Sequence, residues 1–161
     1  MSGPREGWRR LWLRGWAVAW RPWQRRAGGC LPERPRILVV RPDHLGDVLF
    51  SGPALRLLRA VFPQAHMTAL VGPWGEAAIR RVADLDEVLT CEFPGFTRQA
   101  KGSLLAPYRL LWREARRLRG FDLAVVLRFD HWWGAMLAYI ARIPRRWGGD
   151  IAGCRPFLTT A

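Results

Sequence analysis

The chain from residue 36 onward alternates short apolar runs with segments of helical periodicity. Four runs are typical of buried strands: 37–40, 67–71, 87–91 and 123–127. Between and after them, apolar residues recur at helical intervals, which predicts helices over 52–62, 76–82, 104–118 and 133–141. Strands that alternate with helices indicate a parallel sheet with right-handed crossovers. The sequence therefore predicts an α/β domain over residues 36–161.

Polar residues follow the first and the last of these apolar runs. The two groups are Asp43, His44 and Asp47, and Arg128, Asp130 and His131. Pro42 bars a regular continuation of the first strand, and Gly46 allows a backbone angle or a close approach that a side chain would forbid. Because open α/β sheets bind ligands at the carboxyl ends of their strands, we expect both groups at one edge of the sheet.

Three segments in this order resemble the family-nine glycosyltransferases, the heptosyltransferases of lipopolysaccharide core synthesis. They are Arg41 with Gly46-Asp47-Val48 and Pro53-Ala54-Leu55, Phe62-Pro63 with residues 67–72, and residues 121–128 with 143–148. The family loop usually carries two serines where this chain has Asp43 and His44. The resemblance covers roughly residues 36–160.

This resemblance implies one half of a two-domain GT-B fold, in which a Rossmann-like N-terminal domain receives the acceptor. The second domain of such enzymes binds the nucleotide-sugar, typically ADP-heptose, without a metal ion. Because the chain ends near the point where the family's first domain finishes, we expect the C-terminal donor domain to be absent and the chain alone to be inactive. The nucleotide-sugar is a substrate, so no cofactor is expected.

Asp47 is the candidate catalytic residue. Inverting glycosyl transfer needs a base that takes the proton of the acceptor hydroxyl, and a positioned carboxylate can do this. The resemblance assigns that role to the aspartate of the Gly-Asp pair. The alternative from the sequence alone is a helix cap, since aspartate is common at the start of a helix.

The expected acceptor-binding residues are Asp43, His44, Gly46, Arg128, Asp130 and His131. His44 has several readings: pairing with Asp43 or Asp47, binding an acceptor carboxylate or phosphate, or no role. Arg145 and Arg146 either bind an anionic acceptor group or flank a strand. No Gly-rich dinucleotide or Walker-type motif and no metal-ligand spacing is present in the sequence, so we predict no metal site.

Residues 1–35 form a basic, tryptophan-rich arm that ends in a linker rich in Gly and Pro. Nine of the 26 Lys and Arg residues lie in the first 36 positions, and the whole chain has a net charge of +13. The tryptophans at helical spacing are Trp8, Trp12, Trp16, Trp20 and Trp23. Such an amphipathic helix suits the surface of an anionic membrane. The alternatives are that the helix packs on its own domain or that the arm is disordered.

These features predict a cytoplasmic glycosyltransferase at the inner face of the membrane. Three scattered cysteines suit a reducing compartment. The expected partners are a glycolipid or saccharide acceptor and a nucleotide-sugar donor. The alternative hypothesis is a non-enzymatic module that binds anionic membranes or nucleic acid, of which nucleic acid is the less favoured. A steep dependence of binding on salt would indicate nucleic acid.

Overall fold

The computed structural model describes residues 11, 15, 17–19, 30–82, 85–96 and 106–160. Its elements from residue 36 are β1 (Arg36–Arg41), α2 (Leu45–Phe50), α3 (Gly52–Val61), β2 (His66–Val71), η2 (Pro73–Gly75), α4 (Glu76–Val82), β3 (Glu87–Thr90), α5 (Ala106–Arg117), β4 (Leu123–Val126), α6 (Trp132–Ile140), β5 (Arg145–Gly148) and η3 (Arg155–Phe157). The α/β class predicted from the sequence is confirmed.

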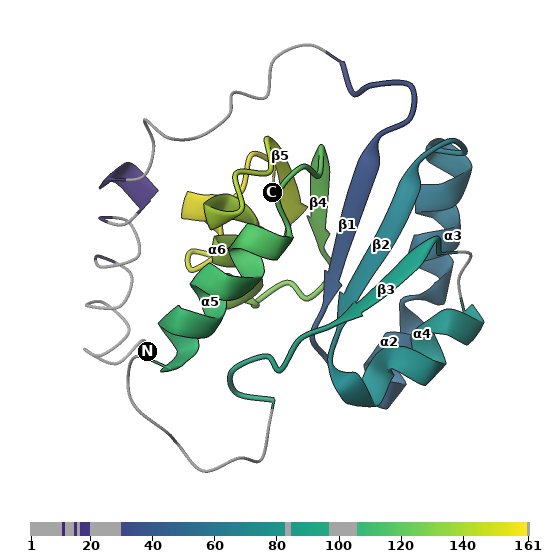
Figure 1. The fold of residues 1–161 in the computed structure, drawn as a ribbon, viewed down its shortest axis with the longest axis horizontal. Coiled ribbons are helices and arrows are strands. Elements are labelled where there is room, and N and C mark those ends of the chain that lie inside the picture. The colour runs from purple at the N-terminus through teal and green to yellow at the C-terminus, as the bar shows by residue number, and fades with distance from the viewer. Residues whose placement is uncertain are drawn as a thin grey trace.

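Five parallel strands form one sheet in the order β3-β2-β1-β4-β5. Helices α2, α3 and α4 cover one face, and α5 and α6 cover the other (Figure 1). Right-handed crossovers require this division, because the chain moves outward from β1 in opposite directions in its two halves. The order of the strands therefore reverses between β1 and β4.

Strand β1 lies at the centre of the sheet and is buried on both faces. Ile37 and Val39 pack in the core beneath α2–α4, whereas Leu38 and Val40 pack in the core beneath α5 and α6. None of the four side chains is more than 1% exposed. This double burial is the physical reason for the unbroken apolar run in the sequence.

The fifth strand, β5, was not predicted, because its sequence is Arg-Arg-Trp-Gly. Arg146 is buried, and its guanidinium donates to the carbonyls of Phe157, 2.6 Å away, Ile143 and Pro144. Burial lowers the pKa of Arg146 to about 10. Arg146 is thus occupied with the backbone that follows and precedes the strand, which favours the strand alternative over acceptor binding.

Ser51 does not cap α3, although a serine directly before a helix is often a cap. Its Oγ donates to the carbonyl of Val48 in the preceding helix, 2.5 Å away. Ser51 has helical backbone angles because it follows α2 directly. A capping residue has an extended backbone that directs its side chain toward the next N–H groups, so Ser51 cannot serve in that way.

The described part of the arm touches the domain at Ala17. Residues 11, 15 and 17–19 are helical. Ala17 is buried in the core beneath α5 and α6, and its carbonyl accepts a hydrogen bond from the Tyr139 hydroxyl. At this position the arm packs on its own domain, whereas Leu11 and Val18 are exposed. The five tryptophans of the proposed membrane face lie outside the described residues. In the described part of the chain, no helix combines the length and apolarity needed to cross a bilayer.

Candidate functional site

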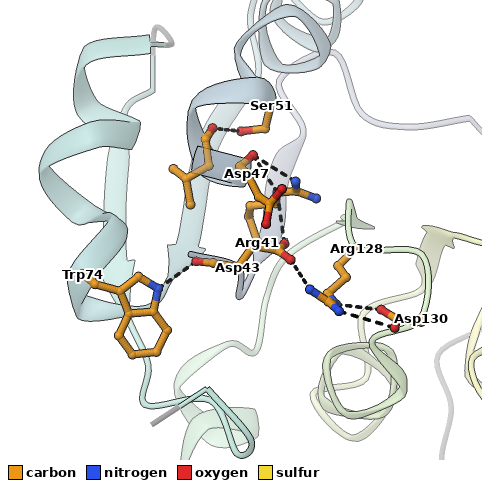
Figure 2. Close-up of polar contacts among 8 residues, drawn as sticks. Arg41, Asp43, Asp47, Ser51, Trp74, Arg128 and Asp130 are labelled. Atoms are coloured by element: carbon orange, nitrogen blue, oxygen red, sulfur yellow. Dashed lines mark hydrogen bonds and ion pairs between the residues drawn. The ribbon is translucent and has the colours of Figure 1, made fainter. Parts of the chain in front are cut away.

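Four charged side chains form a row where the strand order reverses. Arg41 Nε lies 3.1 Å from Asp43 Oδ2, Arg128 contacts Asp43 Oδ1, and Arg128 Nε lies 2.6 Å from Asp130 Oδ1. Figure 2 shows the row running from the end of β1 to the loop after β4. The topology thus brings together two loops that are separated by more than eighty residues, as the sequence predicted for Asp43, Arg128 and Asp130.

Asp43 is the buried member of this row, and its side chain is 3% exposed. Its Oδ2 accepts no hydrogen bond from the described residues, because the Arg41 N–H groups point at another oxygen. The contact between Arg41 and Asp43 is therefore ionic. Hydrogen bonds from Arg128 to Asp130 and Asp43 raise the pKa of Arg128. In this geometry Asp43 holds two guanidinium groups, and its predicted contact with an acceptor stays a prediction.

Asp47 is the third residue of α2 and is exposed. The Arg41 guanidinium donates to its backbone carbonyl, with Nη2 2.9 Å and Nε 3.3 Å away. The residue before the helix is His44, and α2 has no side-chain cap. No described residue donates to the Asp47 carboxylate, so the cap alternative lacks support. Arg41 fixes the backbone of Asp47 and leaves its carboxylate open to a ligand.

Gly46 leaves empty space beside this carboxylate. Its backbone is that of an ordinary helix, and a Cβ added to it would meet nothing within 4 Å. The special backbone angle that we considered from the sequence is therefore not needed. The other explanation for Gly46, a close approach by a second group, remains. The exposed first turn of α2 offers room next to Asp47 that a larger side chain at position 46 would fill.

The loop after β3 brings Phe96 into the site, which the sequence did not predict. The Phe96 ring centroid lies 5.7 Å from that of His44 and 5.8 Å from that of His131. The Arg128 guanidinium carbon lies 5.2 Å from the same centroid. A loop has no hydrophobic period, so only the Phe-Pro-Gly-Phe composition of residues 93–96 and their place after a strand could have marked it.

His44 is exposed and makes aromatic contacts instead of ion pairs. Its ring lies 5.8 Å from that of Trp74, in addition to Phe96. Trp74 is fixed in turn, since its Nε1 donates to the Asp43 carbonyl over 2.7 Å. In the described structure His44 forms no ion pair or hydrogen bond with Asp43 or Asp47. The pairing that we considered from the sequence is therefore absent, and the acceptor role stays a prediction.

His131 lies beneath Phe96 and is only 6% exposed. It meets the Phe93 ring edge-on at 5.4 Å, and neither ring nitrogen has a hydrogen-bond partner among the described residues. Burial lowers the pKa of His131 to about 4, so the imidazole is neutral at pH 7. Little of the ring is therefore open to a ligand, and its predicted acceptor contact stays a prediction.

Residues after β5 brace the loop that carries Arg128 and Asp130. A Cβ added to Gly149 would lie 2.7 Å from Phe129 Cα, so only glycine permits this approach. The Cys154 thiol also lies 3.5 Å from the Phe129 carbonyl. These contacts fix the second loop of the site from behind.

The parallel sheet with helices on both faces is a Rossmann-like α/β fold, and two solved glycosyltransferase structures share it. The glycosyl transferase family 9 structure from Veillonella parvula matches with a TM-score of 0.63 and 22% identity, over 83% of this chain and 37% of that one. Escherichia coli ADP-heptose lipopolysaccharide heptosyltransferase II matches with a TM-score of 0.58 and 24% identity, over 76% and 33%. At this level of identity the likeness shows the fold.

Two relatives are similar in sequence, and both are glycosyltransferases. They are the lipopolysaccharide heptosyltransferase 2 proteins of Salmonella typhimurium strain LT2 and Escherichia coli strain K12. Each is 26% identical over 118 residues, which is 72% of this chain and 32% of the relative. No family model matches the chain. The chain thus spans about a third of the length of these relatives.

Proposed function

We propose that this chain is the acceptor-binding part of an inverting glycosyltransferase of the heptosyltransferase kind. The observation that carries the proposal is the open Asp47 carboxylate, which an arginine holds by its backbone at the reversal point of a GT-B-like sheet. The homology to two heptosyltransferases supports the same reaction class. The substrates we propose are a nucleotide-sugar of the ADP-heptose type and a glycolipid or lipopolysaccharide core acceptor.

The proposed step is a displacement at the anomeric carbon of the donor sugar. The acceptor hydroxyl lies beside Gly46, and its proton passes to the Asp47 carboxylate as its oxygen forms the new bond to that carbon. The bond between the carbon and the phosphate oxygen breaks, and the nucleoside diphosphate leaves. Attack from the opposite side inverts the anomeric configuration. A positioned base contributes about 10²- to 10⁴-fold to such a step.

The charged row positions this base. Arg41 binds the Asp47 carbonyl, and Asp43 lies against Arg41 and Arg128. Asp43 and Arg128 therefore act through Arg41 in the proposed mechanism. Among the described residues, no group of three or more His, Cys, Asp or Glu side chains is arranged to hold a metal ion.

The donor site lies, in this proposal, in the part of the relatives that the matched segment does not cover. The relatives are about three times as long as the matched segment. We therefore expect the purified chain of 161 residues to transfer no sugar from ADP-heptose by itself. Sugar transfer by this chain alone would contradict the proposal that the acceptor site and the donor site lie in different parts of the protein.

The test uses Escherichia coli that lacks heptosyltransferase 2. The complete reading frame that encodes this chain is expressed there, and lipopolysaccharide mobility is compared with that of the empty strain. We expect mobility to be restored by the unaltered protein and by Val61→Ala, an exposed position on α3, and to stay unrestored with Asp47→Asn. Failure of the unaltered protein, with labelled ADP-heptose also left unused in extracts, would reject a heptosyltransferase.

A further inference from the structure

Both arginines of the site are already paired with carboxylates. Arg41 is engaged by Asp43 and by the Asp47 carbonyl, and Arg128 by Asp43 and Asp130. The row and Asp47 together hold two guanidinium groups and three carboxylates, a net charge of −1. Asp47 is the member without an ion-pair partner among the described residues. A ligand that carries its own carboxylate or phosphate would meet net repulsion from these five groups.

Aromatic surface takes the place of free charge. The loops after β1, β2 and β3 deliver His44, Trp74 and Phe96, whose rings stand side by side at 5.7 and 5.8 Å. His44 is exposed, and the other two rings are half-buried. The face of an aromatic ring carries partial negative charge, which attracts the weakly positive C–H groups on one side of a sugar ring.

We propose that the acceptor seated beside Asp47 is an uncharged sugar, recognised by His44, Trp74 and Phe96 through ring contact and not by ion pairing. This inference rests on the proposed function, since it takes the edge at Asp47 as the acceptor site. His44 stands where the family usually carries a serine, so the inference concerns a feature of this chain's own.

Two probes that differ in one group test the charge preference. They are methyl β-D-glucopyranoside and its C6-oxidised form, methyl β-D-glucuronide, titrated into the purified 161-residue chain. Binding is followed by the NMR signals of the Trp74 Nε1–H and the His44 ring. We expect the glucoside to bind at least about ten-fold more tightly, which corresponds to roughly 1.4 kcal/mol. Equal or tighter binding of the glucuronide, or no binding of either probe, overturns the inference.

Substitutions then separate ring contact from charge. Phe96→Leu keeps the bulk of the side chain and removes the ring, and we expect it to weaken glucoside binding about five-fold or more, by loss of a contact of roughly 1 kcal/mol. Asp47→Asn removes the net negative charge, and we expect it to bring glucuronide binding up toward that of the glucoside. Val61→Ala lies at the far end of α3 and serves as the control. Unchanged binding in Phe96→Leu, or an unchanged preference in Asp47→Asn, counts against the inference.

The two proposals fail separately. Sugar transfer in cells that depends on Asp47, together with a preference for the charged probe, rejects the uncharged acceptor and keeps the glycosyltransferase. If the chain prefers the uncharged probe but no sugar transfer is detected, the edge remains a saccharide-binding site and the enzymatic function is rejected.

Discussion

At the scale of single residues, Asp47 has the freedom that a base needs. Its carboxylate makes no hydrogen bond with a described residue, while its backbone is held by Arg41. Replacement by asparagine keeps the size of the side chain and removes the proton acceptor. We expect Asp47→Asn to lower kcat for sugar transfer by the complete protein by about 10²- to 10⁴-fold.

Thermal unfolding of the same variant provides the control. Because the carboxylate contributes no described contact, we expect the midpoint of unfolding to remain that of the unaltered protein. A large fall in this midpoint would instead indicate a structural role for Asp47.

The buried ring of His131 leads to a second prediction, a loss of stability in acid. Burial, and to a lesser extent Arg128, lower its pKa from 6.5 to about 4, against opposing contributions from Asp43 and Asp130. Between these values the unfolded chain binds a proton that the folded chain does not. Stability therefore falls as the pH drops from about 6.5 to 4, by at most about 3 kcal/mol from this group.

The measurement is urea unfolding at a series of pH values. We expect His131→Leu to flatten the fall in stability between pH 6.5 and 4, since the titrating ring is gone. Stability at pH 7 should change little, because both ring nitrogens are buried without partners. His66→Gln, at a half-exposed ring on β2, provides a matched control that retains the fall. An equal slope in both variants would show that His131 does not titrate as stated.

At the scale of elements, a buried carboxylate joins the loop after β1 to the loop after β4. Removal of one partner of a buried ion pair leaves charge without compensation, at a cost of about 3 kcal/mol. We expect Asp43→Ala to reduce the free energy of unfolding by about this amount. Asp150→Ala removes an aspartate whose pair with Arg155 is wholly exposed, and it should leave stability unchanged within error. Equal effects of the two substitutions would contradict the structural role of the row.

Elements built from apolar residues could be predicted from the sequence, and those built from charged residues could not. The run over 37–40 is buried as expected, and Leu111, Ala115 and Leu118 are buried in the segment 104–118, which was predicted to be a helix. Strand β5 was missed because Arg146 is satisfied by carbonyls that lie in neighbouring segments. Such compensation depends on tertiary structure, which a local pattern does not contain.

The residues of the site also divide into those that could be predicted from the sequence and those that could not. Asp43, Asp47, Arg128 and Asp130 could be placed at one edge, because strands of a parallel sheet end together. Phe96 and Trp74 could not, since their approach to His44 depends on the strand order β3-β2-β1 and on loops without periodicity. For the same reason, the sequence could not decide among the several interpretations of His44.

At the scale of the whole molecule, the charge of +13 and an exposed apolar surface favour an anionic membrane as the place of action. Four large apolar side chains of α2 and the first two turns of α3 are exposed: Leu45, Leu49, Phe50 and Leu57. We propose that the protein lies at the inner face of the membrane, where a glycolipid acceptor would be found. This surface adds to the tryptophans predicted from the sequence.

Sedimentation with lipid vesicles tests this location. We expect the chain to bind vesicles that contain phosphatidylglycerol and to bind phosphatidylcholine vesicles more weakly, with partial retention in 0.5 M salt because apolar insertion is not screened. Trp16→Ala with Trp20→Ala should lower the bound fraction, whereas Arg145→Gln alone should change it little. Complete release by salt, or no dependence on the two tryptophans, would contradict membrane insertion.

The neutralised row around Asp43 also separates long-range attraction to a charged surface from recognition of the bound sugar. The field of a strongly basic molecule reaches about 10 Å into solution at moderate salt and draws polyanions toward its surface. At the carboxyl edge three aspartates offset that field locally, so electrostatic attraction is weaker there than over the rest of the surface. Added salt should slow the encounter with an anionic envelope and yet leave the ranking of bound sugars as it was. Such a protein would be attracted to many anionic surfaces but would bind few kinds of sugar.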